Sequence, residues 1–316
     1  MENNVLDVRG LSVDIGARRA VSSVSFSVGR GECCALVGES GSGKTLTAMA
    51  VSGLLPDGMR ATGEIIFRPS GGGEVNLAAL SEEKLRVLRG AEISTVFQDP
   101  GASLTPTMRI GRMLEETLLA HGKLTRAEAC KKAADALKAV EIPSPEEALR
   151  RYPHAFSGGQ RQRIAIAGAV ICSPSLVIAD EPTTALDVLA QEKVMELFGK
   201  IVRGGAAVLM ITHNLALCGE LCSHVYVMYA GQIVERGTTA EVFSTPAHPY
   251  TAALLDCVPV PQMRGKLREI PGTFTEADKT GCPFFSRCPV SKAECQSAPI
   301  PEHTVSPTHF ARCIHA

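Results

Sequence analysis

The octapeptide Gly38-Glu-Ser-Gly-Ser-Gly-Lys-Thr45 has the residue types and the spacing of a loop that binds phosphate groups. Its glycines let the backbone turn so that successive N–H groups face one point, and the N-terminus of a following helix adds partial positive charge there. Lys44 would reach the β- and γ-phosphates of a nucleotide, and Thr45 would offer its hydroxyl to Mg²⁺. A flexible turn is the alternative, but the octapeptide stands between a strand-like run and a helix-like run. The predicted contacts to the nucleotide are Gly38, Glu39, Ser40, Gly41, Ser42, Gly43, Lys44, Thr45 and Leu46.

Two adjacent carboxylates end the apolar run Leu176-Val-Ile-Ala-Asp180-Glu181. We expect Asp180 to hold Mg²⁺ through water, as enzymes with a phosphate loop require. Glu181 is placed to polarise the attacking water as a general base. An Asp-Glu pair elsewhere would usually be a solvated surface pair, but its position at the end of a buried strand favours a metal-binding and catalytic role.

A third stretch, Phe156-Ser-Gly-Gly-Gln-Arg-Gln-Arg163, puts a serine and two glycines at a predicted helix N-terminus. Such a terminus is a second anion site, here formed by Ser157, Gly158, Gly159 and Gln160. One γ-phosphate and two phosphate-binding surfaces suggest that each of two chains completes the site of its partner.

The eleven cysteines divide into two groups. We expect the first group to be small buried hydrophobic residues, and it comprises Cys33, Cys34, Cys130, Cys172, Cys218, Cys222 and Cys257. The second group, Cys282, Cys288, Cys295 and Cys313, lies in a proline-rich tail with little core of its own.

For this second group we predict one [4Fe–4S] cluster, by elimination. A reducing cytosol disfavours disulfides, and metal binding would explain why such a tail folds. The gaps of five, six and seventeen residues are wider than the paired knuckles of structural zinc sites. Zinc, or no metal at all, remains an alternative.

The elements that must position these residues alternate between strands and helices. The predicted strands are Cys33–Val37, Ile93–Phe97, Leu176–Ala179 and Val208–Thr212, and the predicted helices are Gly43–Leu54, Arg161–Ile171 and Leu189–Val202. Such alternation predicts an α/β fold with a mainly parallel sheet. Val5–Val13 and Ser22–Val28 favour an N-terminal antiparallel β edge, and residues 107–156 an inserted helical subdomain.

Composition narrows the class of protein. Of 316 residues, 45% are hydrophobic and 21% charged, as in a globular protein with a large core. The net charge of −1 disfavours nucleic acid as the main partner. The N-terminus has no signal peptide pattern, and no run is long enough to cross a bilayer, so we expect a cytosolic chain.

Over residues 5–245 the sequence resembles the nucleotide-binding subunits of ABC transporters, which use ATP and Mg²⁺ as P-loop ATPases and translocases. Ser157–Gln160 is similar to the family signature, with Phe156 where leucine is commoner. The resemblance implies that Gln98 touches Mg²⁺ and the attacking water, that Asp187 belongs to the D-loop, and that His213 contacts the γ-phosphate.

Two positions depart from the family pattern. Ile15 stands where an aromatic residue usually stacks on adenine, which would lose about 1 kcal/mol of stacking. Asn214 replaces the aspartate that commonly follows the histidine.

The tail resembles the C-terminal extension of the peptide and nickel importer branch, through His248–Leu255, Arg268–Gly272 and the cysteine segment. We therefore divide the chain into an ABC domain, 1–245, and an extension, 246–316. The resemblance implies a heterodimer with a second ATPase subunit, two transmembrane permease subunits and an extracytoplasmic solute-binding protein, at the cytoplasmic face of the bacterial inner membrane. The cargo would be di- or oligopeptides, with a nickel complex as the alternative. A soluble ABC ATPase acting on nucleic acid is a more distant alternative.

Overall fold

The computed structural model describes residues 4–258, 269–272 and 281–316. Its larger sheet has the strand order β11-β12-β10-β9-β3-β8-β7-β6, and its smaller sheet the order β2-β1-β4-β5. The strands of the larger sheet are β3 (Cys33–Val37), β6 (Ile93–Val96), β7 (Leu176–Asp180), β8 (Ala207–Thr212), β9 (His224–Tyr229), β10 (Gln232–Thr238), β11 (His303–Thr304) and β12 (Phe310–Ala311). Those of the smaller sheet are β1 (Asn4–Ile15), β2 (Arg18–Gly29), β4 (Met59–Phe67) and β5 (Val75–Asn76).

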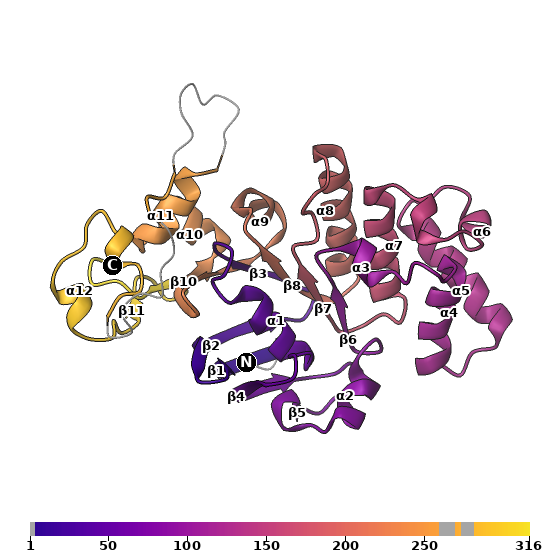
Figure 1. Cartoon of the computed structure of the whole chain (residues 1–316), viewed down its shortest axis with the longest axis horizontal. Helices are drawn as coiled ribbons and strands as arrows, with labels where there is room; N and C mark the ends of the chain where they lie inside the picture. Colours follow the sequence, from indigo (N-terminus) through magenta and orange to yellow (C-terminus); the bar gives the residue numbers. More distant parts are fainter. Residues whose placement is uncertain (1–3, 259–268, 273–280) are drawn as a thin grey trace.

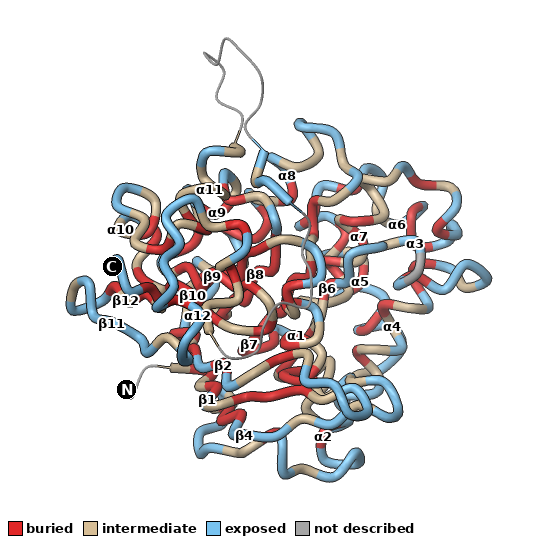
Figure 2. The backbone as a smooth tube through the Cα atoms, turned by 60° about the vertical axis from the view of Figure 1, so that its left-hand side comes forward, coloured by how far each residue is buried: buried red, intermediate tan, exposed pale blue. Residues whose placement is uncertain are grey.

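The parallel part of the larger sheet carries the predicted chemistry. Strands β3, β8, β7, β6 and β9 pair in parallel, and every residue of β3, β7 and β8 is buried. Continuous apolar runs are typical of strands covered on both faces. The four strands predicted from such runs are confirmed, with ends shifted by one residue at most, and Figure 2 shows this burial along the middle of the molecule.

The smaller sheet confirms the predicted antiparallel edge but is larger than expected. β1 pairs with β2 and also with β4, and β4 pairs with β5. The sequence did not indicate β4, because its middle residues are exposed and only Ile65–Phe67 are buried.

The helices cover the sheets and build the insert. They are α1 (Lys44–Ser52), α2 (Glu82–Leu88), α3 (Pro100–Ser103), α4 (Ile110–His121), α5 (Arg126–Ala139), α6 (Pro145–Ala148), α7 (Gly158–Val170), α8 (Val188–Arg203), α9 (Leu215–Leu221), α10 (Thr239–Ser244), α11 (Pro249–Asp256) and α12 (Glu294–Ser297), with short 3₁₀ helices η1 (Leu77–Ala79), η2 (Pro153–Ala155) and η3 (Phe285–Arg287). The predicted helical insert is present as α4, α5 and α6, which form one end of the molecule in Figure 1. Ile110, Leu114 and Leu118 give α4 a buried stripe at a spacing of four residues.

The C-terminal tail is tied to the core more closely than its prolines suggested. Strand β12 pairs with β10, so that the tail extends the larger sheet. Phe284 and Tyr250 are buried and belong to the same hydrophobic core as strand β3. The expectation that little besides a metal would hold the tail is therefore wrong. Arg268 of the predicted tail pattern lies outside the described residues.

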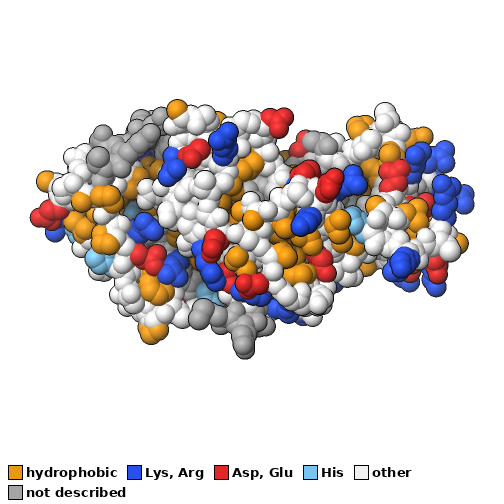
Figure 3. Space-filling view, turned by 90° about the horizontal axis from the view of Figure 1, so that it is seen from below, with side chains coloured by type: hydrophobic (Ala, Val, Ile, Leu, Met, Phe, Trp, Pro, Cys, Tyr) orange, Lys and Arg blue, Asp and Glu red, His pale blue; other side chains and the backbone are white. Residues whose placement is uncertain are grey.

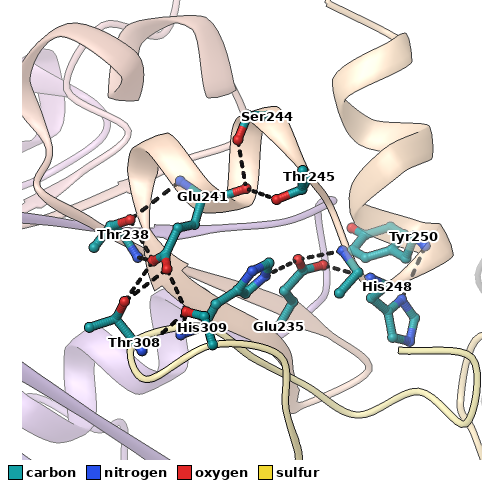
Figure 4. A network of polar contacts seen from close by, with 11 residues as sticks. Glu235, Thr238, Glu241, Ser244, Thr245, His248, Tyr250, Thr308 and His309 are labelled. Carbon is teal, nitrogen blue, oxygen red and sulfur yellow. Dashed lines mark hydrogen bonds and ion pairs between the residues drawn. The ribbon is translucent and has the colours of Figure 1, made fainter.

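Polar contacts add to this attachment, as Figure 4 shows. The carboxylate of Glu235 on β10 is 1% exposed and lies 2.7 Å from Nε2 of His309. It also accepts hydrogen bonds from the backbone N–H groups of Ala247 and His248. Because a buried carboxylate needs such partners, the tail and β10 are held as one unit.

Candidate active site

The phosphate loop follows β3 and opens α1, as its motif predicts. Gly38 and Gly43 have φ angles of 153° and 103°, which side chains rarely adopt. A Cβ atom on Gly38 would lie 2.1 Å from the carbonyl oxygen of Met228, so only glycine lets the loop pass this close to β9. The loop therefore needs its glycines for both turn and packing.

Lys44 lies at the centre of the loop. Its Nζ donates hydrogen bonds to the carbonyl oxygens of Gly38, at 2.8 Å, and Glu39, at 2.9 Å. The side chain is buried, and burial lowers the pKa of Lys44, although the charges of Glu181 and Asp180 act in the opposite direction. A cation held in this way is ready to exchange carbonyl oxygens for phosphate oxygens.

Thr45 and Asp180 come together from different elements. The hydroxyl Oγ1 of Thr45, on α1, lies 3.3 Å from Oδ1 of Asp180, at the end of β7. Burial raises the pKa of Asp180, while the hydrogen bond from Thr45 lowers it. A hydroxyl and a carboxylate oxygen are hard ligands of the kind that Mg²⁺ prefers, so this pair fits a magnesium ion.

Glu181 is the meeting point of three loops. Its carboxylate accepts hydrogen bonds from Gln98, at 3.1 Å, and Thr184, at 2.9 Å, and lies 3.3 Å from Nδ1 of His213. Its backbone has a φ of 45°, a conformation that costs free energy outside glycine and is found at functional sites. Glutamine, glutamate and histidine, predicted from separate motifs, thus lie side by side.

One cavity of about 850 Å³ collects most of the predicted contacts. Of the predicted residues it is lined by Ile15, Ser40, Gly41, Gly43, Lys44, Thr45, Leu46, Gln98, Glu181 and His213. Gly38, Glu39, Ser42 and Asp180 are not part of this lining. The volume suits a ligand the size of a nucleotide.

The serine–glycine stretch lies outside this cavity. Ser157 caps α7, its Oγ accepting from the N–H of Gln160, and Asp187 caps α8 in the same manner. Ser157–Gln160 and Ala185–Asp187 line a separate surface depression. Beside it, Val188 and Leu189 expose 70% and 71% of their surface. Val188 and Leu189 thus form an exposed apolar pair next to this depression.

The comparisons with known proteins agree with this geometry. A model of the ABC transporter family matches residues 21–184, and a model of the oligopeptide/dipeptide transporter C-terminal region matches residues 234–295. The chain is 43% identical to the dipeptide transport ATP-binding protein DppD of Bacillus subtilis, over 98% of this chain and 94% of that protein. It is 42% identical to the oligopeptide transport ATP-binding protein OppD of Escherichia coli, over 98% and 92%. The chain belongs to the ABC transporter family.

Solved structures of this family have the same fold. The dimeric, post-hydrolysis state of the ATP-binding cassette MJ0796, bound to ADP and phosphate, superposes with a TM-score of 0.64 at 26% identity and covers 74% of this chain and 98% of that one. The chain is thus an ABC ATPase that uses ATP and Mg²⁺. In the part that the structure describes, none of the helices has both the length and the apolar character of a membrane span.

The two residues that depart from the ABC pattern, Ile15 and Asn214, lie in different parts of the structure. Ile15 lines the nucleotide cavity and is 36% exposed. Asn214 caps α9, its side chain accepting from the N–H of Ala216 at 3.1 Å. Asparagine and aspartate are equivalent as helix caps, so this substitution keeps the local structure.

Several site residues were missed by the sequence analysis. Thr184 bonds to Glu181, and Arg18, Arg19 and Gln232 line the nucleotide cavity. Gly281 and Pro283 of the tail also line it. The position of Thr184, three residues after Glu181, is a weak sequence indication that it belongs to the site. Nothing in the sequence indicates that Pro283 lies near the phosphate loop.

The four tail cysteines gather around one small cavity, about 10 Å³ in volume. Burial raises the pKa of Cys282 to about 11, and the charges of Cys288, Cys295 and Cys313 act in the same direction. Four thiols that repel one another as thiolates are a donor set that a metal centre would stabilise.

The scattered cysteines were predicted to be buried, and the prediction is partly wrong. Cys33, Cys34, Cys218 and Cys222 are buried, Cys172 and Cys257 are half-buried, and Cys130 is exposed. The buried positions of α5 are Ala129, Ala133 and Leu137, so Cys130 lies one residue off that stripe.

Proposed function

We propose that this chain hydrolyses ATP to power the import of di- or oligopeptides. The observation that carries the proposal is the match of residues 234–295 to the oligopeptide/dipeptide transporter C-terminal region, in a chain whose phosphate loop lines a cavity of nucleotide size. The relatives named above are peptide transporters, and the nickel alternative gains no support from them.

In the proposed mechanism the phosphate loop binds ATP, with Lys44 on the β- and γ-phosphates and Thr45 and Asp180 beside Mg²⁺. Glu181 accepts a proton from the attacking water. Gln98 and His213, whose side chains lie 3.1 Å and 3.3 Å from this carboxylate, orient the water and contact the γ-phosphate.

A second ATPase subunit would complete the site. Ser157–Gln160 and Asp187 line a depression separate from the chain's own nucleotide cavity, so we propose that they cap the γ-phosphate bound by a partner. Helix α7 would direct its N-terminal N–H groups at that phosphate. Following the tail resemblance, we propose that the partner is a different ATPase subunit, and that closing and opening of the pair drives transport.

The permease contact is proposed at a groove of about 310 Å³ between β6, α4 and α7. Leu54 and Phe97 are exposed beside it, at 36% and 41%. Phe97 precedes Gln98, so a cytoplasmic segment of a permease seated here would sense the state of the nucleotide site. Following the family resemblance, we propose that the chain lies at the cytoplasmic face of the cell membrane and works with two permeases and an extracytoplasmic binding protein.

We propose that nucleic acid is not the main partner, because the net charge of the chain is −1. In the face drawn in Figure 3, acidic and basic side chains are interspersed, and the described part of that face has no continuous basic stripe. Proteins that bind phosphate backbones need such a stripe.

We further propose that Cys282, Cys288, Cys295 and Cys313 hold one [4Fe–4S] cluster, with a structural role. A tetrahedral zinc ion with bonds of about 2.3 Å would draw its sulfurs to about 3.8 Å from one another. Among the described residues, the one group of three ligand atoms within 4.8 Å of one another is Glu32, Cys34 and His224, so no three of the tail sulfurs lie that close together. Wider spacing favours a cube, although the loops must open around it.

Transport of peptides is tested in a strain that lacks the chain and needs an amino acid supplied as a di- or tripeptide. We expect the wild-type chain to restore growth and uptake of labelled peptide, and Lys44→Ala to restore neither at equal expression. Equal peptide uptake with and without the chain, or restored uptake of nickel alone, would contradict the proposal.

The metal centre is tested by anaerobic purification. We expect a brown protein with about four irons per chain, lost in Cys288→Ser and kept in the matched control Cys130→Ser. A colourless protein with one zinc, or with no metal, would show that the cluster assignment is wrong.

A further inference from the structure

Glu39, the second residue of the phosphate loop, is held by the tail. Its carboxylate forms a two-fold ion pair with Arg287, with Nη1–Oε2 and Nη2–Oε1 distances of 2.7 and 3.0 Å. Its backbone N–H donates to the hydroxyl of Tyr250 at 2.8 Å. Thus both the side chain and the backbone of this loop residue contact the segment after residue 245.

Arg287 is built into the tail rather than resting on its surface. Its side chain is 5% exposed, and its Nε donates to the carbonyl oxygen of Pro271 at 2.9 Å. The guanidinium lies 5.8 Å from the centre of the Phe284 ring and 5.9 Å from that of Tyr229. The residue occupies η3, the short helix between Cys282 and Cys288, so its position depends on the fold of the cysteine segment.

The charge of Glu39 would otherwise oppose nucleotide binding. The carboxylate belongs to a loop that must receive the negative phosphates of ATP, and its charge acts on Lys44, raising the pKa that burial lowers. A negative group at this place repels phosphate unless a cation neutralises it. Arg287 supplies that cation in a two-fold geometry that also turns the carboxylate toward the tail.

We propose that Arg287 is a positioning residue for ATP binding, which neutralises Glu39 and holds its carboxylate away from the phosphates. The tail of this ABC ATPase then contributes directly to the nucleotide site, together with Gly281 and Pro283 in the cavity wall. The inference rests on the proposed use of the phosphate loop for ATP but not on the identity of the cargo or of the metal.

The test is a charge-rescue experiment on the isolated full-length chain, with a labelled ATP analogue and Mg²⁺ in a binding titration. We expect Arg287→Gln to weaken binding about tenfold, because it leaves the Glu39 carboxylate unpaired. Glu39→Gln removes the charge itself and leaves the backbone N–H groups of the loop in place, so we expect the double variant Glu39→Gln/Arg287→Gln to bind ATP more tightly than Arg287→Gln alone. The loss of ATP affinity in Arg287→Gln, relative to wild type, should also become smaller as the salt concentration rises from 0.1 to 0.5 M, since salt screens charge repulsion.

A matched control is Glu302→Gln, which removes another ion pair between tail and core, with Arg236 of β10, at 2.5 Å. We expect it to leave ATP affinity unchanged. The inference is overturned if Arg287→Gln binds ATP as wild type does, or if the double variant is as weak as Arg287→Gln, because the arginine would then act only through tail folding. Failure of the wild-type chain to bind ATP would instead overturn the proposed function, and the inference with it.

Discussion

Replacing Glu181 by glutamine isolates its proposed role as a base. Glutamine has the same shape and can keep the hydrogen bonds that the carboxylate accepts from Gln98 and Thr184. What the variant loses is the ability to take a proton from water. Positioned proton transfer contributes about 10²–10⁴-fold to a rate, or about 3–5 kcal/mol of the barrier. We therefore expect hydrolysis to fall by at least about 10²-fold while ATP binding stays intact.

The matched control is Thr184→Ala, which keeps the base but removes one hydrogen bond of 2.9 Å to it. Loss of one such bond to a charged group costs about 1.5 kcal/mol, so we expect about a tenfold drop in rate. Both variants are assayed by phosphate release in the assembled transporter, with ATP binding measured in parallel. Near-normal turnover of Glu181→Gln, or a larger loss in Thr184→Ala, would refute the assignment of the base.

Three further predictions concern adenine binding, the partner subunit and the tail. Ile15→Tyr should tighten ATP binding by up to about tenfold in a titration, because a ring adds about 1 kcal/mol of stacking on adenine; weaker or unchanged binding would place adenine elsewhere. The purified chain alone should hydrolyse ATP slowly, with a specific activity that rises with protein concentration; full activity from a proven monomer would exclude a two-chain site. Hydrogen bonds from Ser306, Thr238 and Thr308 lower the pKa of Glu241 from its ordinary 4.5 to about 2. Their contribution to stability is therefore complete above about pH 4.5 and is lost as the pH falls toward 2. Wild type should lose thermal stability over that range more steeply than Glu241→Gln, and parallel curves would contradict this.

The parts of the site that the sequence predicted are those whose chemistry is local. A phosphate loop needs its glycines and its lysine in one short stretch, and the apolar strand before Asp180 is buried on both faces. The roles of Gln98 and His213 came from the family resemblance rather than from local chemistry, and the structure places both side chains beside Glu181.

The parts that could not be predicted depend on distant contacts. Arg287 and Glu39 are 248 residues apart in the sequence, and no local sequence pattern around either residue predicts their ion pair. Strand β12 has two residues and gains its place by pairing with β10 rather than by its own periodicity. Cys130 shows that residue type alone does not predict burial, because a shift of one residue along α5 decides whether a side chain is buried or exposed.

The central claim is that this ABC ATPase couples ATP hydrolysis to peptide import. The most direct measurement is the rate of phosphate release by the chain assembled with its second ATPase subunit and two permeases in lipid vesicles, with the binding protein added in peptide-loaded or empty form. We predict that the peptide-loaded form raises hydrolysis several-fold, and that labelled peptide crosses the membrane only when ATP is present. A rate that does not respond to peptide, or that responds only to a nickel complex, would contradict the account.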